Sequence, residues 1–199
     1  MHFLQRPADA PAELERLQNE RPYGPWDASI PRQEIKVALQ VMQGSHCAYC
    51  ERTVGSDGHI EHFRRRADHP ELTFDWHNLF YSCSNPNSCG KFKDLRAKRP
   101  VPYLNLIDPC HDDPEDYFDF LSDGNIVPKA NLSSSQKQKA LTTIATFNLQ
   151  SLRHEREQYI AAWIGLMGNQ EALRASLERM KASSFSTALF HLFGMRRSM

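Results

Sequence analysis

Two cysteine pairs decide the fold of this 199-residue chain, and they read Cys47-Ala48-Tyr49-Cys50 and Cys83-Ser84-Asn85-Pro86-Asn87-Ser88-Cys89. The N-terminal residues contain no basic segment followed by an apolar one, so we expect no signal peptide and a cytoplasmic protein. Cysteines in that setting indicate metal ligation rather than disulfides. We expect zinc, because four thiolates suit its tetrahedral shell. The predicted structural zinc ligands are Cys47, Cys50, Cys83 and Cys89.

Two other interpretations of these cysteines stay open. The second pair has five intervening residues instead of two, which weakens the zinc pattern. A redox-active C-x-x-C or a set of buried free thiols would also account for the cysteines. The fifth cysteine, Cys110, is left over, and we expect it to be packed or exposed without a ligand role.

A carboxylate–histidine pair, Glu61-His62, and an asparagine, Asn78, lie between the cysteine pairs. Hydrolysis of a phosphodiester needs a base to activate water and a cation to stabilise the developing charge. A neutral histidine can act as the base near pH 7, and a carboxylate can hold Mg²⁺ with few other protein ligands. An asparagine amide can hold the loop beside the histidine. The order of these residues between two zinc-type pairs indicates a hydrolytic site.

Residues 46–95 resemble the HNH endonuclease module with a zinc knuckle. The resemblance is carried by Cys47, Cys50, Glu61, His62, Asn78, Leu79, Cys83, Cys89 and Lys93. It implies the ββα-metal fold, in which a β-hairpin and a helix surround one divalent cation. By this resemblance His62 is the general base, Glu61 binds a catalytic Mg²⁺ or Mn²⁺, and Asn78 holds the histidine loop in place.

A broader resemblance, over roughly residues 46–160, is to the PtuB-like HNH proteins of Septu anti-phage systems and of some retrons. It rests on Ile60-Glu61-His62-Phe63-Arg64, Phe74-Asp75-Trp76-His77-Asn78-Leu79-Phe80, Cys89-Gly90-Lys91-Phe92-Lys93-Asp94, Ile107-Asp108-Pro109-Cys110 and residues 140–149. It implies a defence nuclease that acts on DNA, or on RNA, with a PtuA-like ATPase of the ABC/SMC type or with retron components. The chain has no P-loop, so nucleotide chemistry must come from another chain.

The sequence departs from the HNH pattern after the fourth cysteine, where Gly90 stands in place of an Asn or His that completes the cation site. Asn87 could take over that role, and His59 and Asp75 are other candidates. If none reaches the cation, Glu61 holds it with water and substrate oxygens alone. The alternative function is therefore a catalytically degenerate zinc-binding subunit that binds nucleic acid or a partner.

The predicted fold class is α+β and mostly helical, with the zinc-knuckle ββα module followed by a C-terminal helical region. We expect four segments: an extended and helical one at 1–45, the HNH module at 46–99, an acidic bridge at 100–128, and a helical scaffold for partner docking at 129–199. Helices are predicted at 12–19 and 32–42, then from caps at Ser133 or Ser134, Ser151, Asn169 and Ser184.

The formal charge is zero, with 24 basic and 24 acidic residues, but the charges are segregated. Residues 100–128 carry seven acidic residues and no basic one, and the segments on either side are net basic. We expect the acidic bridge to fold onto the basic helices, dock on a partner, or repel substrate. Phosphate binding is expected from Arg64, Arg65, Arg66, Lys91 and Lys93, although an arginine run is also typical of a solvated turn. No run of eighteen apolar residues exists, which excludes a membrane span.

Overall fold

Two small antiparallel sheets and a larger set of helices make up the computed structural model, which describes residues 1–96, 100–165 and 176–197. The predicted mixture of helix and sheet is confirmed. The principal elements are α1 (Ala12–Glu20), α2 (Arg32–Gln43), β1 (His59–His62), β2 (Leu79–Ser82), α3 (Cys89–Leu95), β3 (Phe118–Phe120), β4 (Ile126–Pro128), α4 (Ser134–Thr146), α5 (Arg153–Gly165), α7 (Leu177–Lys181) and α8 (Ser186–Leu192). Short 3₁₀ helices lie at Pro70–Leu72, Trp76–Asn78, Tyr103–Asn105, Pro114–Asp116 and Leu149–Leu152.

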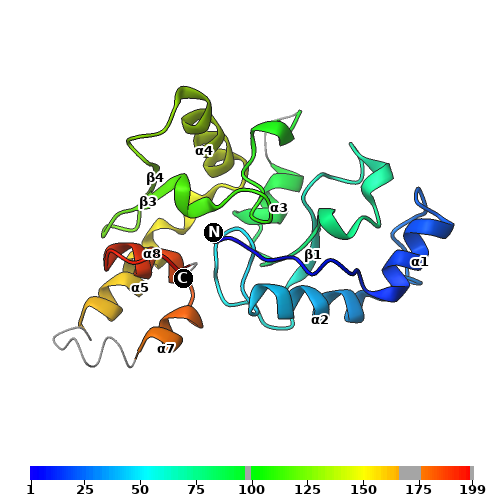
Figure 1. Cartoon of the computed structure of the whole chain (residues 1–199), viewed down its shortest axis with the longest axis horizontal. Coiled ribbons are helices and arrows are strands. Elements are labelled where there is room, and N and C mark those ends of the chain that lie inside the picture. The colour runs from blue at the N-terminus through cyan, green and yellow to red at the C-terminus, as the bar shows by residue number, and fades with distance from the viewer. Residues whose placement is uncertain (97–99, 166–175, 198–199) are drawn as a thin grey trace.

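The first sheet positions the candidate site. Strands β1 and β2 pair antiparallel, with His59 opposite Ser82 and His62 opposite Leu79. Helix α3 follows β2, so the chain order is strand, strand, helix. In Figure 1 this hairpin lies above α2, with α1 at one end of the molecule and α5, α7 and α8 at the other. Helix α2 packs on both strands, and α3 packs on α4.

The N-terminal helices agree with their predicted ranges. Helix α1 begins at the predicted residue and ends at Glu20, and α2 runs one residue beyond the predicted end, to Gln43. Gly44 ends α2 in the left-handed conformation, with φ of 60°. A residue without a Cβ adopts that conformation at little cost, which is why a glycine is typical after a helix.

The C-terminal helices agree only in part. Ser133 caps α4 through a reciprocal capping box with Gln136, as one of the two predicted caps. Leu141 of α4 is 45% exposed, because it lies 100° around the helix from the buried Ala140. The helix predicted from Ser151 begins instead at Arg153, after a 3₁₀ turn. The cap predicted at Asn169 lies outside the described residues.

The apolar residues at the start of and along α8 pack into the core of the protein. Ser184, the predicted cap, instead donates its hydroxyl proton to Thr53, and α8 begins at Ser186. Phe185, Leu189 and Phe190 are buried against the rest of the chain. Tyr159 of α5 is 38% exposed and contacts Phe185 through a ring edge.

The acidic bridge contains more structure than the sequence indicates. Strands β3 and β4 form a hairpin whose turn includes Asp123-Gly124. Buried side chains from all four predicted segments join one hydrophobic cluster, exemplified by Leu39, Phe80, Phe118 and Phe147. The boundaries between segments therefore lie within one continuous core, and the division into functional units stays a prediction.

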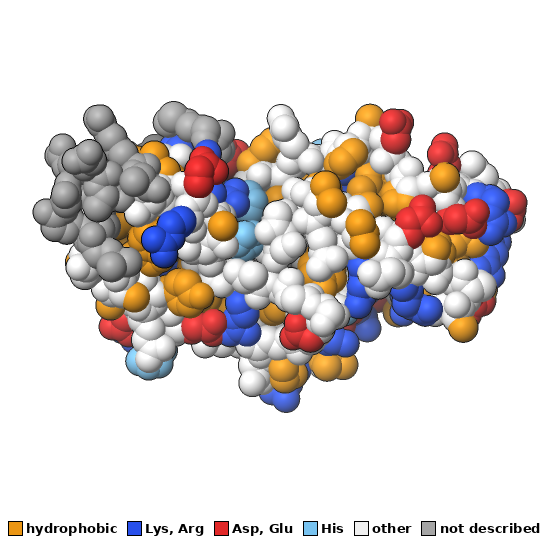
Figure 2. All heavy atoms as spheres, turned by 90° about the horizontal axis from the view of Figure 1, so that it is seen from below, with side chains coloured by type: hydrophobic (Ala, Val, Ile, Leu, Met, Phe, Trp, Pro, Cys, Tyr) orange, Lys and Arg blue, Asp and Glu red, His pale blue; other side chains and the backbone are white. Residues whose placement is uncertain are grey.

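Across the ranges that the structure describes, none of the helices combines the length and the apolar character needed to traverse a bilayer. On the face in Figure 2, acidic and basic side chains are interspersed and neither sign forms a broad field. The surface charge is therefore locally mixed there, although the two signs are segregated along the sequence.

Candidate active site and metal centre

The four predicted ligand cysteines come together in one buried cluster. The Sγ atoms of Cys47, Cys50, Cys83 and Cys89 all lie within 4.8 Å of one another. Four thiolates bound at about 2.3 Å to a tetrahedral zinc would be about 3.8 Å apart, and the Cys50 and Cys83 sulfurs are 3.9 Å apart. All four are free cysteines. The cluster therefore has the donors and the spacing to hold a metal ion such as zinc.

The longer spacing of the second pair reflects how the two cysteines are placed. Cys83 follows β2, whereas Cys89 is the first residue of α3 and has a positive φ of 57°. The loop between them reaches the C-terminal region, where the backbone oxygen of Asn87 accepts hydrogen bonds from Asn148 and Ser151. The extra residues thus contact another part of the fold and leave the cysteine cluster intact.

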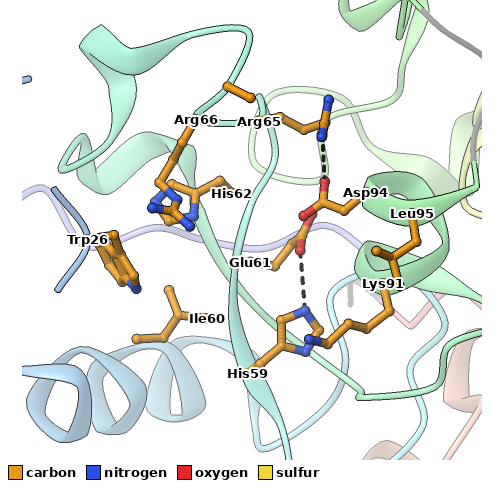
Figure 3. Close-up of a pocket in the computed structure, with 11 residues that line it drawn as sticks. Trp26, His59, Ile60, Glu61, His62, Arg65, Arg66, Lys91, Asp94 and Leu95 are labelled. Atoms are coloured by element: carbon orange, nitrogen blue, oxygen red, sulfur yellow. Dashed lines mark hydrogen bonds and ion pairs between the residues drawn. The ribbon is translucent and has the colours of Figure 1, made fainter. Parts of the chain in front are cut away.

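Glu61 and His62 are consecutive residues of β1, so their side chains leave opposite faces of the strand. Both nevertheless border one pocket of about 550 Å³ (Figure 3). Glu61 lies on the side of α3 together with His59, and His62 lies on the side of Trp26. The pocket is lined by Trp26, His59, Ile60, Glu61, His62, Arg65, Arg66, Ala67, Lys91, Asp94 and Leu95.

The imidazole of His62 is buried and has one defined partner. Its Nε2 lies 2.9 Å from the backbone oxygen of Thr73. A carbonyl oxygen only accepts, so Nε2 carries the proton and Nδ1 carries the lone pair when the ring is neutral. Burial lowers the pKa of His62 from 6.5 to about 4. The ring is therefore neutral at pH 7, which is the protonation state that a general base requires. Trp26 packs its ring edge-on against the imidazole at 4.7 Å.

Asn78 fastens the loop that follows His62. Its Oδ1 accepts a hydrogen bond from the backbone N–H of Arg64 at 2.7 Å, and its Nδ2 donates to the backbone oxygens of Arg64 and Leu72 at 3.0 Å. These are the contacts expected of a residue that holds the histidine loop.

The carboxylate of Glu61 is buried and has a cationic partner. Its Oε1 lies 2.6 Å from Nζ of Lys93, and its Oε2 lies 3.3 Å from Nε2 of His59. Burial acts to raise the pKa of Glu61, but Lys93 and His59 outweigh it and hold the pKa below its ordinary value. The side chain is therefore an anion, as a cation ligand must be.

Gly90 leaves the space that the Glu61 carboxylate occupies. A Cβ at position 90 would lie 2.3 Å from Oε2 of Glu61 and 2.4 Å from its Cδ, both far inside contact distance. In this fold any side chain at position 90 would displace the carboxylate. The Glu61 carboxylate can occupy this position because residue 90 is a glycine and not the usual Asn or His.

The structure places Lys93 differently from the phosphate contact expected of it. Its side chain is fully buried, and Nζ donates to the backbone oxygens of His62 at 2.5 Å and Phe63 at 3.0 Å. The same ammonium pairs with Glu61 and lies 3.2 Å from Asp94. This cation binds the end of β1 inside the protein and is not exposed to contact nucleic acid.

The other predicted basic residues remain near the pocket. Arg65, Arg66 and Lys91 line it, while Arg64 is half-buried in the adjoining loop. Arg65 pairs with Asp94 at 3.3 Å, and the guanidinium of Arg66 lies over the Trp26 ring. Arg66 and Lys91 thus offer positive charge at the pocket on two sides (Figure 3).

Two of the candidates for the second cation ligand lie elsewhere. The side chain of Asn87 is exposed, accepts from Arg96 at 3.3 Å, and does not line the pocket. Asp75 caps a 3₁₀ helix by accepting from the N–H of His77. His59, the third candidate, lines the pocket.

No local sequence pattern indicates one wall of this pocket. Trp26 comes from the proline-rich segment before α2, far from the motif, and stacks on Phe74 while it contacts His62. Only the packing of α2 on the hairpin brings it there. Asp94 follows Lys93 directly and could have been suggested by its position on α3.

Three relatives are found among known proteins. The chain is 28% identical over 131 residues to the Septu protein PtuB of Bacillus mycoides (strain KBAB4), covering 53% of this chain and 44% of that protein. It is 31% identical over 86 residues to the Septu protein PtuB of Bacillus thuringiensis, covering 42% and 31%. It is 26% identical over 143 residues to the "Retron Vc95 putative HNH endonuclease" of Vibrio cholerae serotype O1 biovar El Tor, covering 67% and 66%. No protein-family model matches the chain.

These relatives confirm the resemblance to PtuB-like HNH proteins, at modest identity. The chain spans less than half the length of the two Septu relatives and 66% of the retron relative. The activity, substrates and partners of this chain are therefore matters for a proposal.

Proposed function

We propose that this chain is a metal-dependent HNH endonuclease that hydrolyses phosphodiester bonds in nucleic acid. One observation carries the proposal. A buried carboxylate and a buried, neutral histidine border the same pocket from opposite faces of β1, within a module that a four-cysteine cluster closes. Water activation and charge stabilisation need those two groups on either side of one phosphate.

Residues in and next to the pocket have defined parts in the proposed reaction. Nδ1 of His62 takes the proton from the attacking water, while the hydrogen bond from Nε2 to Thr73 keeps the ring in the required tautomer. Asn78 keeps the loop after His62 in place. Arg66 and Lys91 hold phosphates next to the scissile bond.

Glu61 is the proposed ligand of a Mg²⁺ or Mn²⁺ ion, and its anionic state and position on the pocket wall fit that role. When bound, the cation stabilises negative charge on the phosphate and the leaving oxygen. The cysteine cluster is the proposed structural zinc site, which ties the turn at Cys47–Cys50 to β2 and α3.

The names of the relatives support a role in anti-phage defence. We infer that the chain acts as the nuclease of a Septu-like system together with a PtuA-like ATPase, on DNA or on RNA. A partner is also consistent with the mixed surface charge, because the chain lacks a broad basic face in the view of Figure 2.

A second function, a catalytically degenerate zinc-binding subunit, is favoured by one observation. Lys93 already neutralises Glu61 at 2.6 Å, and Gly90 supplies no ligand from α3. The experiment that separates the two functions is cleavage of labelled DNA and RNA by the chain with its ATPase partner, in Mg²⁺ or Mn²⁺. A nuclease cuts in the presence of the cation and loses cutting in His62→Ala, whereas a degenerate subunit binds without cutting.

A further inference from the structure

The cation site lacks a ligand from α3, but β1 offers another one. Residues two apart on a strand project from the same face, so His59 and Glu61 leave β1 on the side of Gly90. Both side chains line the pocket, and Figure 3 shows the His59 ring directed toward the Glu61 carboxylate. The histidine thus lies beside the carboxylate on the same strand, and the carboxylate fills the space next to Gly90.

The distance between the two donor atoms fits a shared cation. Neighbouring ligands at right angles around an ion at about 2.1 Å are about 3.0 Å apart. Nε2 of His59 and Oε2 of Glu61 are 3.3 Å apart, and the second oxygen of Glu61 is held by Lys93. Lys93 therefore fixes the carboxylate with Oε2 turned toward the histidine.

The ring of His59 is not committed to another part of the protein. Among the residues that the structure describes, its Nδ1 is buried without a hydrogen-bond partner, and Nε2 contacts only Glu61. The His59 side chain is 22% exposed and both residues line the pocket, so the histidine side of the donor pair is accessible from it. A cation held there would keep its remaining positions for water and phosphate oxygens, as a catalytic site requires.

We propose that His59 is the second protein ligand of the catalytic cation, with Nε2 of His59 and Oε2 of Glu61 binding one divalent ion. This inference rests on the proposed nuclease function and names the ligand that replaces the missing residue at position 90. An imidazole donor favours Mn²⁺ over Mg²⁺ and disfavours Ca²⁺, which takes oxygen ligands. Asp94 is not proposed as a ligand, because it forms ion pairs with Lys93 and Arg65.

The test is Mn²⁺ binding by the full, zinc-loaded chain, followed by electron paramagnetic resonance. Wild type is compared with His59→Ala, with Glu61→Gln, and with His77→Ala, an exposed histidine outside the pocket as the control. We expect wild type and His77→Ala to bind one Mn²⁺. His59→Ala should weaken binding about tenfold or more, since even the loss of outer-shell partners costs that much. Pulsed spectra should show coupling of Mn²⁺ to a histidine nitrogen in wild type and lose it in His59→Ala.

Unchanged Mn²⁺ affinity and nitrogen coupling in His59→Ala would overturn the inference, as would a wild-type chain that binds no Mn²⁺. Nitrogen coupling that persists in His59→Ala and disappears in His62→Ala would also overturn it, because the ligand would then be the other histidine. Cleavage by the chain with its ATPase partner is measured in parallel. Cutting by His59→Ala at the wild-type rate contradicts only the ligand assignment, whereas no cutting by wild type contradicts the nuclease function itself.

Discussion

His62 derives its chemistry from its surroundings. The hydrogen bond to Thr73 selects the tautomer, and Trp26, which itself stacks on Phe74, packs an apolar ring against the imidazole. Burial disfavours the charged ring, which is why the pKa falls to about 4. The same environment that keeps the base neutral at pH 7 makes acid conditions costly for the fold.

The stability of the protein should reflect this pKa. Above pH 6.5 the ring is neutral in both the folded and the unfolded chain, so it contributes no pH dependence. Between pH 6.5 and about pH 4, His62 is protonated in the unfolded chain but neutral in the folded chain. Folding is therefore weakened as pH falls through that window, by about 3 kcal/mol at its lower end.

Urea unfolding of wild type and His62→Gln between pH 7 and pH 4 measures this effect. Both proteins share the cysteine cluster and the carboxylates, so the difference between their unfolding free energies isolates the histidine. We expect wild type to lose more stability than His62→Gln as pH falls. Parallel curves for the two proteins would show that His62 titrates normally.

Helix α3 is joined to the hairpin by one buried ion pair. Removing a single member of such a pair leaves a buried charge without its partner. Lys93→Ala should therefore lower the free energy of unfolding by about 3–5 kcal/mol. Lys91→Ala, two residues earlier on the pocket wall, should change it by about 0.5 kcal/mol or less.

Denaturant unfolding and cleavage of the same two variants separate the roles of the lysines. Lys91→Ala should keep the stability and reduce nucleic-acid cleavage, because we place Lys91 against phosphate. Equal stabilities of the two variants would contradict the buried pairing of Lys93 with Glu61.

The zinc knuckle should be required for the fold of its elements. Metal analysis of protein prepared without chelator should find one zinc per chain. Cys50→Ser should lose the zinc, and a loss of about 4 kcal/mol would lower Tm by about 8–16 °C. Cys110→Ser is the matched control. Cys110 is not one of the four clustered cysteines, and burial raises the pKa of its thiol to about 11. A zinc content unaffected by Cys50→Ser would contradict the assignment of the four-cysteine cluster as the zinc site.

Local signals in the sequence were enough for some elements. Pro31 precedes the first residue of α2 and Gly44 ends the helix, while the capping box of Ser133 and Gln136 begins α4. These residues act on the backbone next to them, so their effect can be recognised in the sequence. The β3–β4 hairpin was missed, since three-residue strands are too short for an alternation to be recognised. The positions of Trp26, and of Lys93 inside the core, depend on packing between distant segments, which no local pattern records.

Part of the candidate site was also predictable from the sequence. The cysteine cluster and the Glu61-His62 pair follow from spacing along the chain, because they are consecutive or flank one hairpin. For the second cation ligand, the sequence left three candidates, of which His59 was one. Choosing among them required the direction of each side chain, and Asn87 and Asp75 lie outside the pocket.

Across the whole molecule, the acidic bridge is matched by basic residues of this same chain. Lys139 of α4 lies 2.7 Å from Asp112, and Arg196 lies 2.6 Å from Asp113 and 3.0 Å from Asp116. The bridge thus folds onto basic residues, one of the three outcomes predicted for it. Such partly exposed pairs add little stability each, but they use basic charge that would otherwise attract nucleic acid. A partner that supplies further positive charge is consistent with this arrangement.

The most direct test of the central claim is cleavage of DNA and RNA by the chain reconstituted with the proposed PtuA-like ATPase, comparing wild type with His62→Ala in Mn²⁺ and Mg²⁺. Wild type should cut in the presence of the cation and stop on its removal. His62→Ala should lose about a hundredfold or more of the rate, as expected for a general base, while keeping its zinc and its folded circular dichroism spectrum. Equal cleavage by wild type and His62→Ala would contradict the assignment of this pocket as a nuclease site.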